Sequence, residues 1–97
     1  MRAPARTSAR LIAHPAVADA SVLGVPDDYY GEVVGAAVRT ADASLPGDRL
    51  AGELAEYCRA RLAAEKVPAR WLVTGTFPLA PSGNVRKDAL RDQLTER

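Results

Sequence analysis

The chain has 97 residues, of which 47% are hydrophobic and only 5% aromatic, and its formal net charge is +1. This length suffices for one small domain, residues 1–97, with a core of aliphatic side chains. The balanced charge argues against a nucleic-acid surface, and no apolar run reaches the roughly 20 residues of a membrane span. A single cysteine, Cys58, excludes an intramolecular disulfide and favours a core position in a reducing, cytoplasmic protein.

The first half of the chain predicts one helix and two strands. A weak helix over residues 6–13 ends at His14-Pro15, because the residue before proline avoids the α region. A strand of small and β-branched residues follows at 17–25 and closes in the acidic turn 26–28. The returning strand, 32–40, is apolar on both faces, so we expect it to be covered on both sides.

The second half predicts helix, strand and helix. Leucine and cysteine recur every four residues over 48–65, where Asp48 is placed to cap the helix. A strand at 70–77 puts Trp71, Val73 and Phe77 on one face, and a short amphipathic helix at 85–95 ends the chain. The order helix-strand-strand-helix-strand-helix predicts an α+β fold. We expect its three-stranded sheet to be covered by helices on one face and to leave another surface for docking.

The segment 71–91 carries the clearest functional signal. Its strand leads into a loop with two prolines and a glycine, and no strand interior tolerates that density of lost donors and free dihedrals. Leu90 and Leu94 then anchor the following helix. A loop held rigidly at both ends is a common place to present a functional side chain.

This segment resembles the C-terminal signature of the adenylate-forming (AMP-binding) superfamily, which includes acyl-CoA synthetases and adenylation domains. The family pattern is P-x-x-x-S-G-K-[VI]-x-[RK]-x-x-L-R, and this chain reads PLAPSGNVRKDALR from Pro78 to Arg91. The resemblance extends over residues 4–91. Further family positions are matched in register by His14-Pro15-Ala16-Val17, Val22, Gly24, Pro26-Asp27, Gly31-Glu32 and Lys66-Val67-Pro68.

The resemblance implies a role for the loop. Where the family has its catalytic lysine this chain has Asn84, supported by Ser82, Gly83, Val85 and Arg86. In the family the lysine ammonium bridges the substrate carboxylate and the α-phosphate of ATP during adenylation, stabilising charge shared between two anions. Asparagine is shorter and neutral, so it supplies neither the reach nor the charge.

The resemblance also implies partners and cofactors. We expect the C-terminal domain of an ATP-dependent, AMP-forming acyl-CoA synthetase or adenylation-type ligase. ATP, magnesium and coenzyme A belong to the full-length enzyme, and we expect this chain alone to bind none of them and no metal. The expected partner is an N-terminal AMP-binding domain in cis or in trans, with coenzyme A or a carrier protein as acceptor.

Two departures from the family pattern bear on activity. The hinge and the large nucleotide-binding domain, which should precede residue 4, are not in this sequence, and Arg6-Thr7-Ser8 replaces the family's E-V-E. We therefore expect a fragment or degenerate homologue of an acid–thiol ligase, catalytically incompetent by itself. The alternatives are a free-standing, non-catalytic interaction module and a small structural dimer.

Several residues have two interpretations from sequence. Asn84 is also a good helix N-cap. Arg86 and Lys87 are nearby cations, and the alternative hypothesis is that one of them substitutes for the missing lysine. His14 is interpreted as a residue at a helix end. The acids Asp27, Asp28 and Glu32 are either solvated or form a cation site. Lys66 and Arg70 either form salt bridges or bind a coenzyme phosphate.

Overall fold

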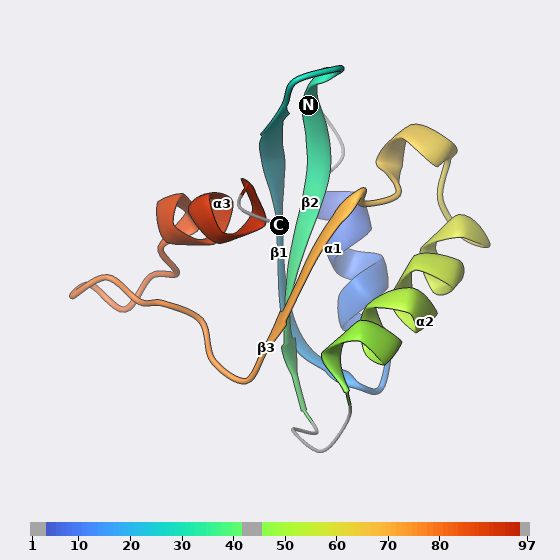
Figure 1. Cartoon of the computed structure of the whole chain (residues 1–97). Helices are drawn as coiled ribbons and strands as arrows, with labels where there is room; N and C mark the ends of the chain where they lie inside the picture. Colours follow the sequence, from blue (N-terminus) through green and yellow to red (C-terminus); the bar gives the residue numbers. More distant parts are fainter. Residues whose placement is uncertain (1–3, 42–45, 96–97) are drawn as a thin grey trace.

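The protein is described by a computed structural model covering residues 4–41 and 46–95 (Figure 1). Its element order agrees with the predicted α+β fold. The elements are α1 (Pro4–Ile12), β1 (Val17–Asp27), β2 (Gly31–Thr40), α2 (Gly47–Arg59), a short 3₁₀ helix η1 (Ala64–Lys66), β3 (Arg70–Thr74) and α3 (Lys87–Thr95). Among these residues no helix has both the length and the apolar character that a membrane crossing requires.

The three strands form one mixed sheet in the order β1-β2-β3. A tight hairpin joins β1 to β2 in antiparallel fashion, whereas β3 pairs parallel to β2. The parallel pair needs a crossover connection, which α2 and η1 provide. Central β2 is therefore covered on both faces, as its doubly apolar sequence predicts: Val34 and Val38 lie in one core and Ala37 in the other.

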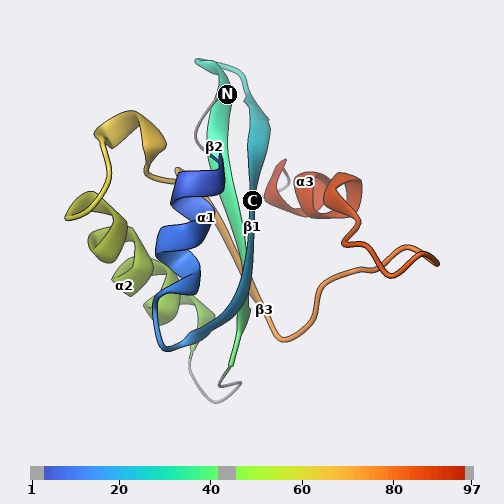
Figure 2. The same ribbon diagram turned by 180° about the vertical axis from the view of Figure 1, so that it is seen from behind.

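Helices cover both faces of the sheet. Helices α1 and α2 lie on one face and α3 on the other, as the two opposite views show (Figures 1 and 2). Leu90 and Leu94 of α3 are fully buried with Leu23 and Leu72. The prediction that helices would cover only one face is wrong, because the amphipathic stripe of α3 needs an apolar surface on which to pack.

Two elements are shorter than predicted. Helix α2 ends at Arg59 rather than 65, since the N–H groups of Arg61 and Leu62 both bond to the carbonyl of Cys58 in a closing turn. Strand β3 ends at Thr74 rather than 77, because its pairing with β2 stops there and Thr74 Oγ1 donates to the carbonyl of Thr76. The chain then bends away from the sheet edge.

This bend moves Phe77 to the other core. Trp71 and Val73 pack on the side of α1 and α2, whereas Phe77 is buried on the α3 side with Leu72. The predicted shared face is therefore wrong for Phe77. Alternation of side chains holds only while the strand continues.

The helix starts also differ from prediction. Pro46, not Asp48, occupies the N-cap of α2, and no side chain caps that end. Asp48 lies in the first turn, where its negative charge interacts favourably with the helix dipole. Helix α3 starts at Lys87 rather than 85, because Val85 pairs with Leu79 in an isolated bridge.

Hydroxyl groups in α1 fasten this helix to the rest of the domain. Thr7 is 1% exposed and its Oγ1 donates to the carbonyl of Lys66 at 3.1 Å. The Ser8 hydroxyl donates to the carbonyl of Ala20 at 3.5 Å. The sequence that replaces the family's acidic signature thus makes its own contacts to η1 and β1.

Candidate functional site

The loop after β3 is itself a narrow hairpin. Leu79 and Val85 face each other in a bridge, and the N–H of Ala80 donates to the carbonyl of Asn84 at 2.8 Å. Gly83 has φ +92°, the left-handed conformation that a three-residue hairpin loop requires at its last position. The hairpin stands away from the sheet, beyond α3 (Figures 1 and 2).

The side chains at the tip of this hairpin are free. Ser82 and Asn84 are exposed, and neither side chain makes a hydrogen bond to any residue of the described part of the chain. The interpretation of Asn84 as an N-cap is wrong, because α3 begins only at Lys87. The amide of Asn84 is therefore available to a group outside this domain.

The two neighbouring cations lie apart from Asn84's free amide. The guanidinium of Arg86 donates to Asp88 at 2.8 Å, and this hydrogen bond raises the pKa of Arg86 and lowers that of Asp88. Lys87 lines a hollow of about 410 Å³ together with Phe77 and Val85, on the side of β1. Arg86 is thus held just before α3, and Lys87 is exposed at the edge of this hollow.

The base of the hairpin is packed on the domain. Val85 is half-buried against the α3 core, and Phe77, immediately before the hairpin, is 6% exposed. Leu90 continues the anchor into α3 and is fully buried. Ser82, Gly83 and Asn84 are therefore carried on a rigid base, as the sequence predicted from the flanking strand and helix.

Three backbone N–H groups of the hairpin are bonded within it. The N–H groups of Ala80, Gly83 and Arg86 donate to the carbonyls of Asn84, Ala80 and Pro78. A phosphate-binding loop needs N–H groups that point outward without partners. These three N–H groups are therefore not available to a phosphate, and the hairpin tip presents the exposed side chains of Ser82 and Asn84 beside them.

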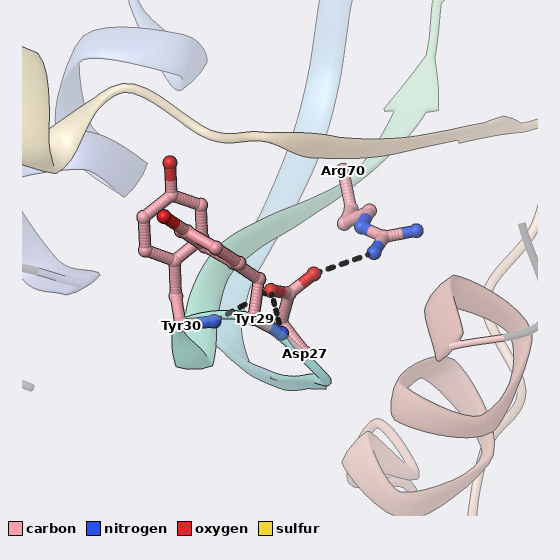
Figure 3. A network of polar contacts seen from close by, with 4 residues as sticks. All are labelled: Asp27, Tyr29, Tyr30 and Arg70. Atoms are coloured by element: carbon pink, nitrogen blue, oxygen red, sulfur yellow. Dashed lines mark hydrogen bonds and ion pairs between the residues drawn. The ribbon is translucent and has the colours of Figure 1, made fainter.

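A second cluster of polar residues lies at the tip of the β1–β2 hairpin (Figure 3). Asp27 Oδ2 accepts the N–H groups of Tyr29 and Tyr30 at 3.0 and 2.8 Å, and Oδ1 accepts Arg70 Nη2 at 3.0 Å. The bond from Tyr30 N–H, together with Arg70, lowers the pKa of Asp27. Asp27 is thus paired rather than merely solvated, and Arg70 forms a salt bridge instead of presenting a free phosphate ligand.

Two tyrosines missed by the sequence analysis form the surface of this tip. Tyr29 and Tyr30 are 85% and 73% exposed, and their rings stack edge-on with centroids 4.7 Å apart. The acids around them hold no cation site: no group of three His, Cys, Asp or Glu suited to a metal occurs in the described ranges. The sequence signal that could have located them is the Asp-rich turn followed by Gly31, because it places the two tyrosines between the strands.

Several family positions have structural roles at the same end of the domain. The carboxyl carbon of Glu32 lies only 2.5 Å from where a Cβ would stand on Gly24, so glycine there leaves room for it. Arg91 Nε donates to the carbonyl of Gly24 at 3.0 Å, tying α3 to β1. Gly31 has φ +80°, which the return into β2 requires.

His14 and Cys58 are also structural. His14 Nδ1 accepts the N–H of Ala16 at 3.1 Å just after α1, and its ring meets Tyr57 edge-on. Cys58 is fully buried in the core under α1 and α2, and burial raises the pKa of its thiol. The predicted core position of Cys58 is confirmed, and a thiol of this kind is unreactive.

Comparison with known proteins gives this fold and its loop a context. The profile of the family described as AMP-binding enzyme C-terminal domain matches residues 9–84. The acyl-CoA ligase sidI of Aspergillus fumigatus is 44% identical over 96 residues, an alignment covering 91% of this chain and 16% of that protein.

Solved structures agree. Brucella canis acyl-CoA synthetase superimposes with a TM-score of 0.80 at 34% identity, covering 96% of this chain and 17% of that one. The o-succinylbenzoate CoA synthetase of Bacillus subtilis, in complex with its acyl-adenylate intermediate, gives 0.73 at 36% identity, covering 92% of this chain and 17% of that one.

The chain thus spans only 16–17% of the length of these relatives. Within that span the agreement covers both sequence and backbone fold. With a profile match over residues 9–84 and a superposition over nearly its whole length, this chain belongs to the family of AMP-binding enzyme C-terminal domains.

Proposed function

We propose that this chain acts as the C-terminal domain of an ATP-dependent, AMP-forming acyl-CoA ligase, joined in cis or in trans to an AMP-binding domain. The observation that carries the proposal is the projecting hairpin, whose exposed Ser82 and Asn84 side chains have no partner in the described part of the domain. A rigid loop with free side chains is suited to enter another domain's active site.

In this proposal the hairpin carries a weakened adenylation function. During adenylation the substrate carboxylate attacks the α-phosphorus of ATP, the bond to pyrophosphate breaks, and negative charge accumulates between the two reactants. The Asn84 amide can donate a hydrogen bond to one of these oxygens but brings no positive charge. Arg86 is paired with Asp88, so it does not replace that charge.

The second half-reaction should be less affected. The acyl group is then transferred to the thiol of coenzyme A or of a carrier protein, and AMP is released. In the family that this chain resembles, this second step does not use the catalytic lysine. We therefore expect slow adenylation followed by nearly normal thioester formation from a supplied acyl-adenylate.

The test is the variant Asn84→Lys, measured in the chain joined to an AMP-binding domain that accepts it. Pyrophosphate exchange reports adenylation, and acyl transfer from synthetic adenylate reports the second step. Supplying one positioned charge typically changes such a rate about 10²–10³-fold, so exchange should rise by that factor while transfer stays unchanged. Asn84→Gln, which adds length without charge, is the matched control.

An unchanged exchange rate in Asn84→Lys would contradict the proposal. The domain would then be better described as a non-catalytic interaction module that binds an AMP-binding domain or a carrier protein. A separate check uses the isolated chain. Because the sequence contains no glycine-rich phosphate-binding motif, calorimetry of this chain with ATP and magnesium should show no saturable heat.

A further inference from the structure

A hollow beside the hairpin combines an apolar wall with one unpaired cation. It lies between the start of β1, the end of β2 and the segment that follows β3, and its volume is about 390 Å³. Small-molecule sites in proteins begin at roughly 300 Å³ and are mainly apolar with a few polar groups. The side chains that matter here are Asp19, Arg39, Thr76, Phe77, Leu79 and Val85.

The cation is Arg39, near the end of β2. Its side chain is half-buried, and within the described residues it makes no ion pair and no hydrogen bond. Asp19 is its cross-strand neighbour in the β1–β2 register, but Asp19 Oδ1 accepts the N–H of Ala20 at 2.9 Å and no salt bridge joins the two residues. A partly desolvated guanidinium without a partner favours the binding of an anion.

Part of the lining of the hollow is apolar, and Asp19, Arg39 and Thr76 make the rest of it polar. Phe77 and Val85 form its packed part, and Leu79 is 60% exposed, one of the few large hydrophobic side chains on the surface. Gly75 and Gly83 also line the hollow, and a Cβ on either glycine would meet no atom within 4 Å, so the entrance is open.

These features select a class of ligand. A guanidinium binds a carboxylate through two parallel hydrogen bonds, and an apolar wall beside it favours a hydrocarbon chain. At about 30 Å³ for each water-sized atom the hollow holds roughly a dozen non-hydrogen atoms, the size of a medium-chain acid. Lys87 lines the adjoining hollow, together with Ser8 and Ser21, and not this one. A highly charged phosphate would therefore meet only one cation here, Arg39.

We propose that this hollow binds a small amphipathic monocarboxylate, with its carboxylate on the Arg39 guanidinium and its hydrocarbon chain against Phe77, Leu79 and Val85. This site belongs to the domain itself and does not depend on the proposed ligase function. Because Leu79 and Val85 form the two arms of the projecting hairpin, the ligand would lie against the base of the element that carries Asn84.

The experiment is a titration of the isotope-labelled chain with sodium octanoate, followed by backbone amide NMR. A ligand of this size on an open surface should bind with a Kd on the order of 1 mM. Saturable shifts should appear at Arg39, Thr76 and Val85. The uncharged analogue octanol should bind about tenfold more weakly, since it lacks the charge-assisted hydrogen bonds.

Variants locate the carboxylate. Arg39→Gln should weaken octanoate binding about tenfold, and Arg39→Lys should fall between the two because it keeps charge without the planar fork. The matched control is Arg10→Gln, an exposed arginine on α1 across the sheet, which should leave the Kd unchanged. The dispersion of the amide spectrum shows that each variant is folded.

Three results would overturn the assignment. The first is that octanoate shifts no residue of the hollow saturably, the second that it binds equally well to Arg39→Gln, and the third that it binds no better than octanol. A larger loss in Lys87→Gln than in Arg39→Gln would place the carboxylate in the adjoining hollow instead. Tight binding of an acidic peptide with none of octanoate would replace the small-molecule ligand by a polypeptide partner.

Discussion

The β1–β2 turn and the hairpin at 78–86 have similar backbone turns, but their polar side chains differ in whether they bond within the domain. Each reverses the chain with a glycine in the left-handed region, Gly31 in one and Gly83 in the other. At the first, Asp27 accepts three hydrogen bonds and binds Arg70 across the sheet. At the second, the hydrogen bonds run between backbone groups, and the exposed Ser82 and Asn84 side chains have no partner in the described part of the chain.

This difference suggests two reasons why a family signature contains polar residues: some stabilise the fold, and others contact a partner. Side chains that bond to one another within the domain stabilise its fold, so their replacement should alter stability. Side chains that form no hydrogen bond within the domain add little to its stability and are available to bind a partner. The predictions below test this division, from the largest expected effect to the smallest.

The largest effect should come from the anchor shared by both regions. Leu90→Ala removes a fully buried side chain that packs α3, and with it the hairpin base, on the sheet. It should lower the free energy of unfolding by about 2–5 kcal/mol, as measured by urea denaturation. Leu79→Ala, at an exposed leucine, is the control and should change stability little.

The two glycines provide a matched pair. Gly31→Ala and Gly83→Ala each force a residue with a Cβ into the left-handed region, which should cost roughly 1–2 kcal/mol in thermal or urea unfolding. We expect similar losses of stability but different losses of function. In the joined enzyme only Gly83→Ala should slow pyrophosphate exchange beyond its effect on folding. Equal slowing by both variants would remove the distinction between the regions.

Asp27→Asn should destabilise the domain in a pH-dependent way. The folded pKa of Asp27 lies below its ordinary value of 3.8, so its ionised form stabilises the fold above that pH. This stabilisation is lost as the pH falls through the folded pKa. The melting temperature of Asp27→Asn should therefore be a few degrees below wild type at neutral pH, and the two should converge in acid. A constant difference would show that the charge is not responsible.

The smallest effect should be at the free side chains. Ser82→Ala and Asn84→Ala should each change the free energy of unfolding by less than about 0.5 kcal/mol, because neither residue bonds within the described domain. Urea denaturation of the isolated chain measures this. A loss as large as that of Gly83→Ala would indicate that these side chains stabilise the hairpin after all.

Much of the fold was predictable because local patterns decided it. The period-two runs of β1 and β2 and the four-residue repeat around Leu54 gave the right elements in the right order. The apolar runs on both faces of β2 predicted that both faces would be covered. A loop beginning at Pro78 was also predictable, since Pro81 and Gly83 leave its chain few other conformations, although its end at 86 was not.

Other features depended on tertiary contacts. The end of β3 was set by the length of its partner β2, and this moved Phe77 to the face opposite the one its alternation predicted. The fate of Asp27 was decided by Arg70, a residue 43 positions away. A local sequence pattern cannot identify a partner that lies 43 positions away. Asp27 would have been solvated if β3 had paired elsewhere.

Sequence alone thus determined the elements, their order and the family signature, because propensity, turn residues and periodicity act over a few neighbouring positions. Tertiary structure alone decided which charged groups are paired and which are free. Arg70 of β3 lies 3.0 Å from Asp27 of β1, whereas Arg39, equally charged in the sequence, makes no ion pair within the described residues and lines a hollow. Ion pairing depends on distances of a few ångströms, and only the packing of β-strands and helices sets those distances.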